Sequence, residues 1–162
     1  MRINPETNHI VMGHESIAAS AVLATAAACN LKNAEGALVV CTYTLGDAVD
    51  VTLTMDEGET AAIAKAGTYK ITTGAEFPIW TMSTAQTLDT WVRQTDAITF
   101  VILNGTYTGT TLVVFDIKAS NLTTDRNWIH LCSAGAASGI LGVHYILYGV
   151  RYQQSAPLTA RG

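Results

Sequence analysis

The feature that most constrains this chain is its shortage of charged residues. Hydrophobic residues make up 49% of the sequence, whereas Asp, Glu, Lys and Arg together make up 14%. An ordinary soluble domain contains roughly 25% charged residues. The 9 basic and 13 acidic side chains are sparse for the roughly 7,800 Å² of surface that a folded monomer of this size exposes. We therefore expect a protein that packs against copies of itself or against a partner.

Length and charge balance limit the class of protein. A chain of 162 residues fits one domain, and such a domain buries about 70% of its unfolded surface without disulfides or metals. The net charge of −4 argues against a nucleic-acid partner, and the basic residues are too scattered for an anionic membrane surface. Cys29, Cys41 and Cys132 show no paired spacing, which favours reduced thiols in a protein made in a cytoplasm. Cys41 occupies an inward strand position, as a small core residue does.

Two apolar stretches resemble membrane-targeting segments, but their details favour other assignments. Ile17–Cys29 follows Glu6 and Glu15, an acidic flank that does not suit a cleaved signal peptide. Leu131–Val150 contains no Asp, Glu, Lys or Arg. Glycines, serines and His144 dilute this stretch, so it falls short of the ~20 strongly apolar residues of a membrane helix. We expect it to form a strand, a turn of small residues and a second strand.

Most of the chain predicts β-strands. Val49–Met55 alternates apolar residues with Asp and Thr, which is typical of a strand with one dry and one wet face. This strand and Ala37–Leu45 flank Gly46-Asp47, which predicts a hairpin. Ala97–Leu103 and Thr110–Lys118 predict a second hairpin, and its long stretch without charge predicts that both strands are buried on both faces. Further strands are predicted at residues 69–73, 78–82, 127–132 and 143–153.

The strands and regular turn signals predict a mainly β, single-domain fold. Eight or nine short strands rich in Thr and Val favour a β-sandwich, of which the jelly roll is one form. We assign residues 17–162 to this domain and Met1–Ser16 to an extended N-terminal arm with an apolar patch, Ile10-Val11-Met12. Ile17–Ala28 stays ambiguous, because alanine favours a helix but no helical periodicity is present.

The sequence contains few candidates for chemistry. His130 and Cys132 lie two residues apart on a predicted strand and share a face, and His144 could join them from the next strand as a third zinc ligand. We favour packed structural residues, because no acidic partner is evident. Cys132 and His144 also lack an orienting acid for nucleophilic catalysis, and no nucleophile elbow, zinc-protease or phosphate-binding motif is present. We expect no enzyme activity, metal or cofactor.

The remaining polar and aromatic residues predict surface features. Asp56, Glu57 and Glu59 favour a solvated turn over a calcium site, because the ligand spacing of a calcium loop is absent. Arg93 and Asp96 predict either a partly buried ion pair at a strand entry or an exposed loop. The larger aromatic residues suit core packing, a sugar-stacking platform or an interface anchor; they are Trp80, Trp91, Trp128, Tyr145, Tyr148 and Tyr152.

An ordered series of four segments spans roughly residues 68–153. The segments are Tyr69–Trp80, Arg93–Ala97, Val114–Ile117 and Tyr145–Tyr152. The series resembles small virion proteins of tailed bacteriophages that are encoded beside the major capsid protein. This resemblance implies a head decoration (cement) protein without an active site, which binds the outer surface of the capsid and commonly forms a trimer.

The resemblance and the charge shortage together predict a virion protein assembled in the host cytoplasm, with the major capsid protein as its partner and no nucleic-acid or membrane partner. We expect Met1–Ser16 to dock on the capsid and the sandwich to form a homotrimer with closed symmetry. A minor tail or head-fibre component and a carbohydrate-binding β-sandwich are the alternatives. The predicted interface residues are Ile3, Pro5, His9, Ile10, Met12, Trp91, Arg93, Asp96, Tyr148 and Tyr152.

Overall fold

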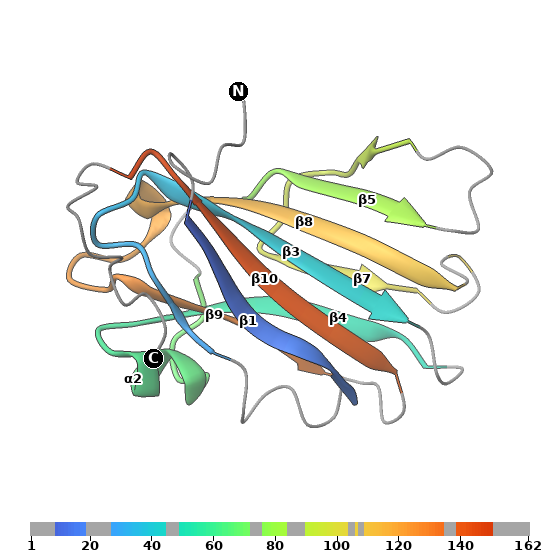
Figure 1. The fold of residues 1–162 in the computed structure, drawn as a ribbon, viewed down its shortest axis with the longest axis horizontal. Helices are drawn as coiled ribbons and strands as arrows, with labels where there is room; N and C mark the ends of the chain where they lie inside the picture. The colour runs from blue at the N-terminus through green and yellow to red at the C-terminus, as the bar shows by residue number, and fades with distance from the viewer. Residues whose placement is uncertain are drawn as a thin grey trace.

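The computed structural model describes residues 9–18, 27–44, 49–71, 76–83, 90–103, 106, 109–134 and 139–150; the side chains of residues 9, 11–18 and 83 are not described. Within these residues the chain forms two antiparallel β-sheets that pack face to face (Figure 1). This arrangement confirms the predicted mainly β sandwich. No helix in the described part of the chain is long and apolar enough to cross a membrane.

One sheet has six strands and the other has four. In sheet order, the six-stranded sheet consists of β1 (His9–Ala18), β10 (Ile140–Tyr148), β3 (Gly36–Thr44), β8 (Thr110–Lys118), β5 (Ile79–Ser83) and β6 (Val92–Arg93). The four-stranded sheet consists of β2 (Cys29–Asn30), β9 (Trp128–Ala134), β4 (Val51–Gly58) and β7 (Thr99–Ile102). A short helix, α2 (Ala61–Lys65), follows β4, and a 3-10 turn, η2 (Ala119–Asn121), follows β8.

The strand order is that of a jelly roll. With β5 and β6 set aside, the first four strands pair with the last four in reverse: β1 with β10, β2 with β9, β3 with β8 and β4 with β7. A long antiparallel ribbon gives this pattern when it rolls up and sends alternate strand pairs to opposite sheets. The β10–β3 pairing joins two of these strand pairs into the six-stranded sheet, and the β9–β4 pairing joins the other two into the four-stranded sheet.

Both predicted hairpins are wrong. β3 and β4 lie in different sheets, so the chain crosses the sandwich between them, and residues 45–48 lie outside the described residues. β7 and β8 are likewise in different sheets. A polar turn between two apolar runs shows where strands end, but it does not show which strand each will pair with.

The prediction that this second pair is buried on both faces is also wrong. β8 alternates strictly between buried and partly buried residues, so only one of its faces looks into the core. β7 is an edge strand of the four-stranded sheet, and Val101 on it is exposed. The lack of charge from Thr110 to Phe115 on β8 therefore has another cause, which is the apolar outer face described below.

The core lies between the two sheets. Its largest fully buried side chains include Tyr43, Phe77, Phe115 and Tyr145. Cys41 faces this core with no exposed surface, as its inward strand position predicts. The Leu131 backbone N–H on β9 donates a hydrogen bond of 3.1 Å to the hydroxyl oxygen of Tyr145 on β10, which links the two sheets through the core.

Replacement of Tyr145 by phenylalanine is expected to destabilise the fold by about 1–3 kcal/mol, because it leaves a buried N–H group without an acceptor. Urea unfolding measures this change as a lower midpoint at unchanged slope. Tyr148→Phe is the control, since the Tyr148 hydroxyl lies in a partly exposed position where water can replace it. An unfolding midpoint for Tyr145→Phe equal to that of the wild type would contradict the role of this bond.

The N-terminal boundary of the sandwich differs from the prediction. β1 begins at His9 and pairs along β10 as far as Ala18, so residues 9–16 of the predicted arm form an edge strand of the six-stranded sheet. Residues 1–8 and 19–26 lie outside the described residues. Of the ambiguous stretch, Ile17 and Ala18 therefore complete β1, and Ala28 is buried without regular structure. The strand, turn and strand predicted for residues 131–150 correspond to β9 and β10, which lie in different sheets.

Candidate functional site

The outer face of the six-stranded sheet is apolar. On four neighbouring strands, β10, β3, β8 and β5, the residues that alternate with the core residues include a set of aliphatic and aromatic side chains that are only partly buried. We call this surface the outer apolar face; its members are Leu38, Val40, Trp80, Met82, Leu112, Val114 and Ile146. Sequence analysis missed it as a surface.

The strand register places part of this face side by side across β3, β8 and β5. Val114 lies opposite Val40 on one side and Trp80 on the other, in the middle of the sheet. One row away, Leu112 lies opposite Met82. Antiparallel sheets with one solvated side normally carry polar residues there. Contiguous apolar patches on soluble proteins are often interaction sites, so this face is a candidate interface.

Polar side chains border the outer apolar face, and two of them pair with each other. The Tyr148 hydroxyl donates a hydrogen bond of 2.6 Å to Oδ1 of Asp116. The ring of Tyr148 crosses Gly36, where an added Cβ would lie only 2.4 Å from the hydroxyl oxygen. Burial, followed by the Asp116 carboxylate, raises the pKa of Tyr148. The hydroxyl of this predicted interface residue is therefore used within the subunit.

Three predicted interface residues gather at the β6 edge of the same sheet. Arg93 forms an ion pair with Asp96, and its guanidinium lies 4.9 Å from the ring centre of Trp80. The predicted Arg–Asp pair is thus present, but both side chains are about two-fifths exposed (42% and 41%) rather than buried. Trp91 is 47% exposed beside them. This edge combines a cation, an anion and an open indole.

The other predicted interface residues fall on the opposite edge or outside the described residues. Ile10 on β1 is 55% exposed, and His9 and Met12 pair through their backbones with Leu147 and His144 of β10. The structure therefore places the predicted residues at two edges of one sheet, with the outer apolar face between them. Ile3, Pro5 and Tyr152 lie outside the described residues.

The aromatic residues do not form an open row where the structure describes them. Tyr145 is in the core. Arg93 covers Trp80, and Arg126 lies 3.7 Å from the ring centre of Tyr69. A sugar-stacking platform needs several exposed rings side by side; Trp91 is 47% exposed, whereas Trp80 and Trp128 are only partly exposed.

The predicted solvated acidic turn is wrong for two of its three residues. Asp56 and Glu57 both belong to β4 and are 1% exposed. Glu57 faces the end of the core, where it accepts hydrogen bonds from the Thr123 N–H at 2.9 Å and from Arg126 at 2.8 Å. Asp56 points to the other side of the sheet, because strand residues alternate.

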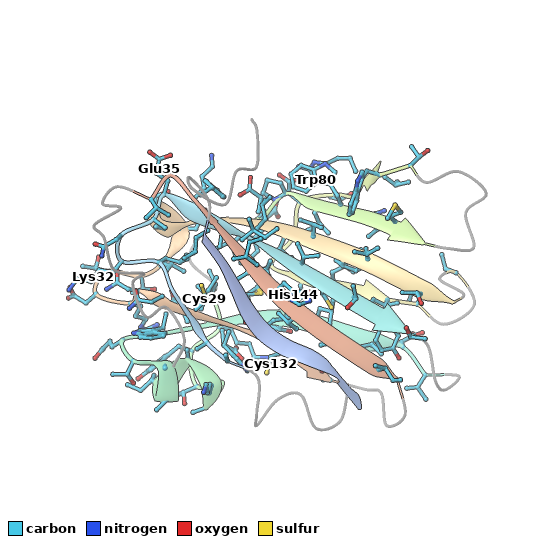
Figure 2. All side chains as sticks on the ribbon, in the orientation of Figure 1. Cys29, Lys32, Glu35, Trp80, Cys132 and His144 are labelled. Atoms are coloured by element: carbon cyan, nitrogen blue, oxygen red, sulfur yellow. The ribbon has the colours of Figure 1, made fainter. Side chains whose placement is uncertain are left out.

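Asp56 joins His130 and Cys132 in a cluster on the outer side of the four-stranded sheet. Asp56 lies opposite His130 in the β4–β9 register, and Cys132 follows two residues later on β9. One possible ligand atom of each residue lies within 4.8 Å of those of the other two. The predicted trio of His130, Cys132 and His144 is not formed, because His144 lies on β10 of the six-stranded sheet, whereas Cys132 lies on β9 of the other (Figure 2).

No protein-family model, characterised protein or solved structure matches this chain.

Burial disfavours the charged form of each of the three side chains in this cluster. Burial, followed by the positive charge of Lys65, lowers the pKa of His130 to about 4. Burial raises the pKa of the Asp56 carboxyl group, against the smaller opposing effects of Cys132 and Lys70. Burial, followed by contact with Asp56, raises the pKa of the Cys132 thiol to about 12. His130 is therefore a neutral imidazole at physiological pH, which is the form that binds metals.

Proposed function

We propose that this protein is a structural subunit of a virion, a decoration protein that assembles as a homo-oligomer and stabilises the outer surface of a tailed-phage head. A trimer is the favoured oligomer, and the major capsid protein is the partner. The observation that carries the proposal is the outer apolar face, whose side chains are only partly buried within the single chain. In this proposal the outer apolar face packs between subunits, and the N-terminal segment reaches the capsid.

Other features of the chain support an assembling subunit. The jelly roll is an architecture of viral capsid domains, and also of lectins. The strands β1 and β6 end the six-stranded sheet on either side, and such edges offer unpaired backbone groups to a neighbouring chain. A stable subunit interface buries about 1,200–2,000 Å², which accounts for a surface that so few charges cover.

Fewer observations support the two alternative functions. A minor tail or head-fibre component would use the same surfaces, and it differs in where the protein sits on the virion. A carbohydrate-binding module needs a row of uncovered aromatic rings, but Arg93 and Arg126 cover the rings of Trp80 and Tyr69.

The solution mass of the full-length protein, measured alone and with empty capsids built from the major capsid protein encoded beside it, tests the proposal. We expect a discrete homo-oligomer, with three chains per particle, that co-sediments with the capsids. A monomer that ignores capsids would overturn the proposal. Co-purification with tails instead of heads would favour the tail component.

A shortened chain in the same experiment distinguishes self-association through the outer apolar face from capsid binding through the N-terminal segment. Because β1 begins at His9, deletion of residues 1–8 keeps every strand of the sheets, whereas deletion of 1–16 would also remove most of β1. We expect the shortened protein to keep its oligomeric mass and to lose capsid binding. Capsid binding that survives this deletion would contradict docking through the N-terminal segment.

A further inference from the structure

The buried cluster on the four-stranded sheet has no role in the proposed assembly, yet its composition is that of a ligand site. We propose that Asp56, His130 and Cys132 bind one Zn²⁺ ion on the outer side of this sheet, beneath α2. This inference is independent of the proposed function.

The strand register places three donor atoms of the right kind together. His130 and Cys132 alternate along β9 and share a face, and Asp56 lies directly across from His130 on β4. The carboxylate oxygen, ring nitrogen and sulfur lie within 4.8 Å of one another. Tetrahedral zinc with bonds of about 2.0–2.3 Å holds its ligand atoms about 3.5 Å apart. Small side-chain rotations are enough to close the remaining distance.

Two of the three ligands are buried, and no described group outside the cluster forms a hydrogen bond with them. Asp56 is 1% exposed and His130 is fully buried. Among the described residues, neither ring nitrogen of His130 has a hydrogen-bond partner, and no nitrogen or oxygen donor reaches the Asp56 carboxyl group, which the Cys132 thiol contacts. Burying such groups unpaired is costly, and folded proteins retain few of them. A bound cation would coordinate an oxygen and a nitrogen at once, which explains why both residues occupy this position.

The segment after β4 encloses the cluster. Ala64 of α2 is fully buried in this region, where α2 packs on β4 and β9. Gly67 follows with φ of +65°, and a Cβ there would lie 3.3 Å from Oδ2 of Asp56, so the backbone passes directly over the carboxylate. Cys132 is only partly buried and leaves a side open for an ion and a water ligand. Three protein ligands with one open position is a known form of zinc site.

The donor set and the charges favour zinc over other common cations. Calcium and magnesium take oxygen ligands, whereas thiolate and imidazole select zinc and its neighbours. The anionic forms of Asp56 and Cys132 balance a divalent ion. Lys65 acts on His130, and Lys70 acts on Asp56 and Cys132. These two cations oppose a bound metal and keep the site weaker than a closed cysteine-rich one.

Metal titration of the full-length protein, stripped with a chelator and then given Zn²⁺ or Co²⁺ alone, tests the site. We expect one equivalent of tightly bound zinc by elemental analysis. Cobalt should produce a thiolate charge-transfer band together with the strong visible bands of tetrahedral coordination, and zinc should displace it. Zinc far below one equivalent, or cobalt bound without a thiolate band, would overturn the proposal.

Matched variants identify the ligands. Cys132→Ala should abolish the cobalt–thiolate band and weaken zinc binding at least about 100-fold. This loss is larger than that caused by removing a residue that only hydrogen-bonds to a metal ligand. Cys41→Ala, at a buried core cysteine, should leave both unchanged. Asp56→Asn keeps the shape and removes the charge, so it tests the same site if Cys132→Ala fails to fold. Its zinc affinity should fall at least about tenfold, and an unchanged affinity would exclude Asp56 as a ligand.

Discussion

Replacement of Glu57 by glutamine is expected to lower the free energy of unfolding by about 2–4 kcal/mol, as the loss of one partner from a buried polar network does. The Glu57 side chain is 1% exposed and accepts bonds from two donors of Thr123 and from Arg126. A glutamine keeps the shape but offers one oxygen and an NH2 group in place of two oxygens. At least one donor then loses its acceptor at the end of the core.

The exposed Arg93–Asp96 pair provides the control for this change. Asp96→Asn makes the same chemical substitution in an ion pair whose side chains are both about two-fifths exposed (42% and 41%). Exposed pairs contribute about 0–1 kcal/mol, so its unfolding midpoint in urea should stay near that of the wild type. If Glu57→Gln and Asp96→Asn lower the free energy of unfolding equally, Glu57 does not hold the loop after η2 to the sheet.

Strand positions and inward residues could be predicted from the sequence, but strand partners could not. The strands predicted at Ala37–Leu45 and Thr110–Lys118 are confirmed as β3 and β8, and so is the inward position of Cys41. Pairing was wrong because neighbours in the chain were assumed to be neighbours in a sheet, whereas a jelly roll sends consecutive strands to opposite sheets. Nothing in Gly46-Asp47 distinguishes a hairpin turn from a crossing between sheets.

The same assumption explains the error in the metal-site candidates. His130 and Cys132 were correctly placed on one face, but His144 was chosen as their partner because β10 follows β9 in the chain. Asp56 was assigned to a turn, although the alternation of apolar and polar residues in Val51–Met55 continues through it. The predicted wet face of this strand is also wrong at Thr54, which is buried like Asp56. An acidic run at a strand end has the same composition whether a helix covers it or water does. Only the position of α2 against β4 in the structure distinguishes a covered acidic residue from a solvated one.

The shortage of charge was the sequence signal for the outer apolar face, and burial on both faces was its wrong explanation. Leu112 and Val114 do not face a second layer; they face outward, where Val114 lies opposite Val40 and Leu112 lies opposite Met82. A single sequence shows that a strand has two apolar sides. It does not show whether the second side meets the same chain or another one.

Replacement of Val114 by glutamate is expected to abolish self-association without unfolding the subunit. Val114 lies in the middle of the outer apolar face, between Val40 and Trp80. Its side chain is partly exposed in the single chain, so the carboxylate can stay hydrated there. Between subunits the same carboxylate would be buried without a partner, at a cost of several kcal/mol. A loss of about 3 kcal/mol weakens association more than 100-fold, which light scattering detects as dissociation to the chain mass.

Val101→Glu is the matched control for this substitution. Val101 lies on β7, an edge strand of the other sheet, and is exposed. The same change there adds the same charge, so it separates an effect of position from an effect of net charge. We expect Val101→Glu to keep the oligomeric mass and Val114→Glu to lose it, with urea unfolding midpoints close to each other. If both variants assemble like the wild type, the outer apolar face is not the subunit interface; if both dissociate, added charge alone accounts for the loss.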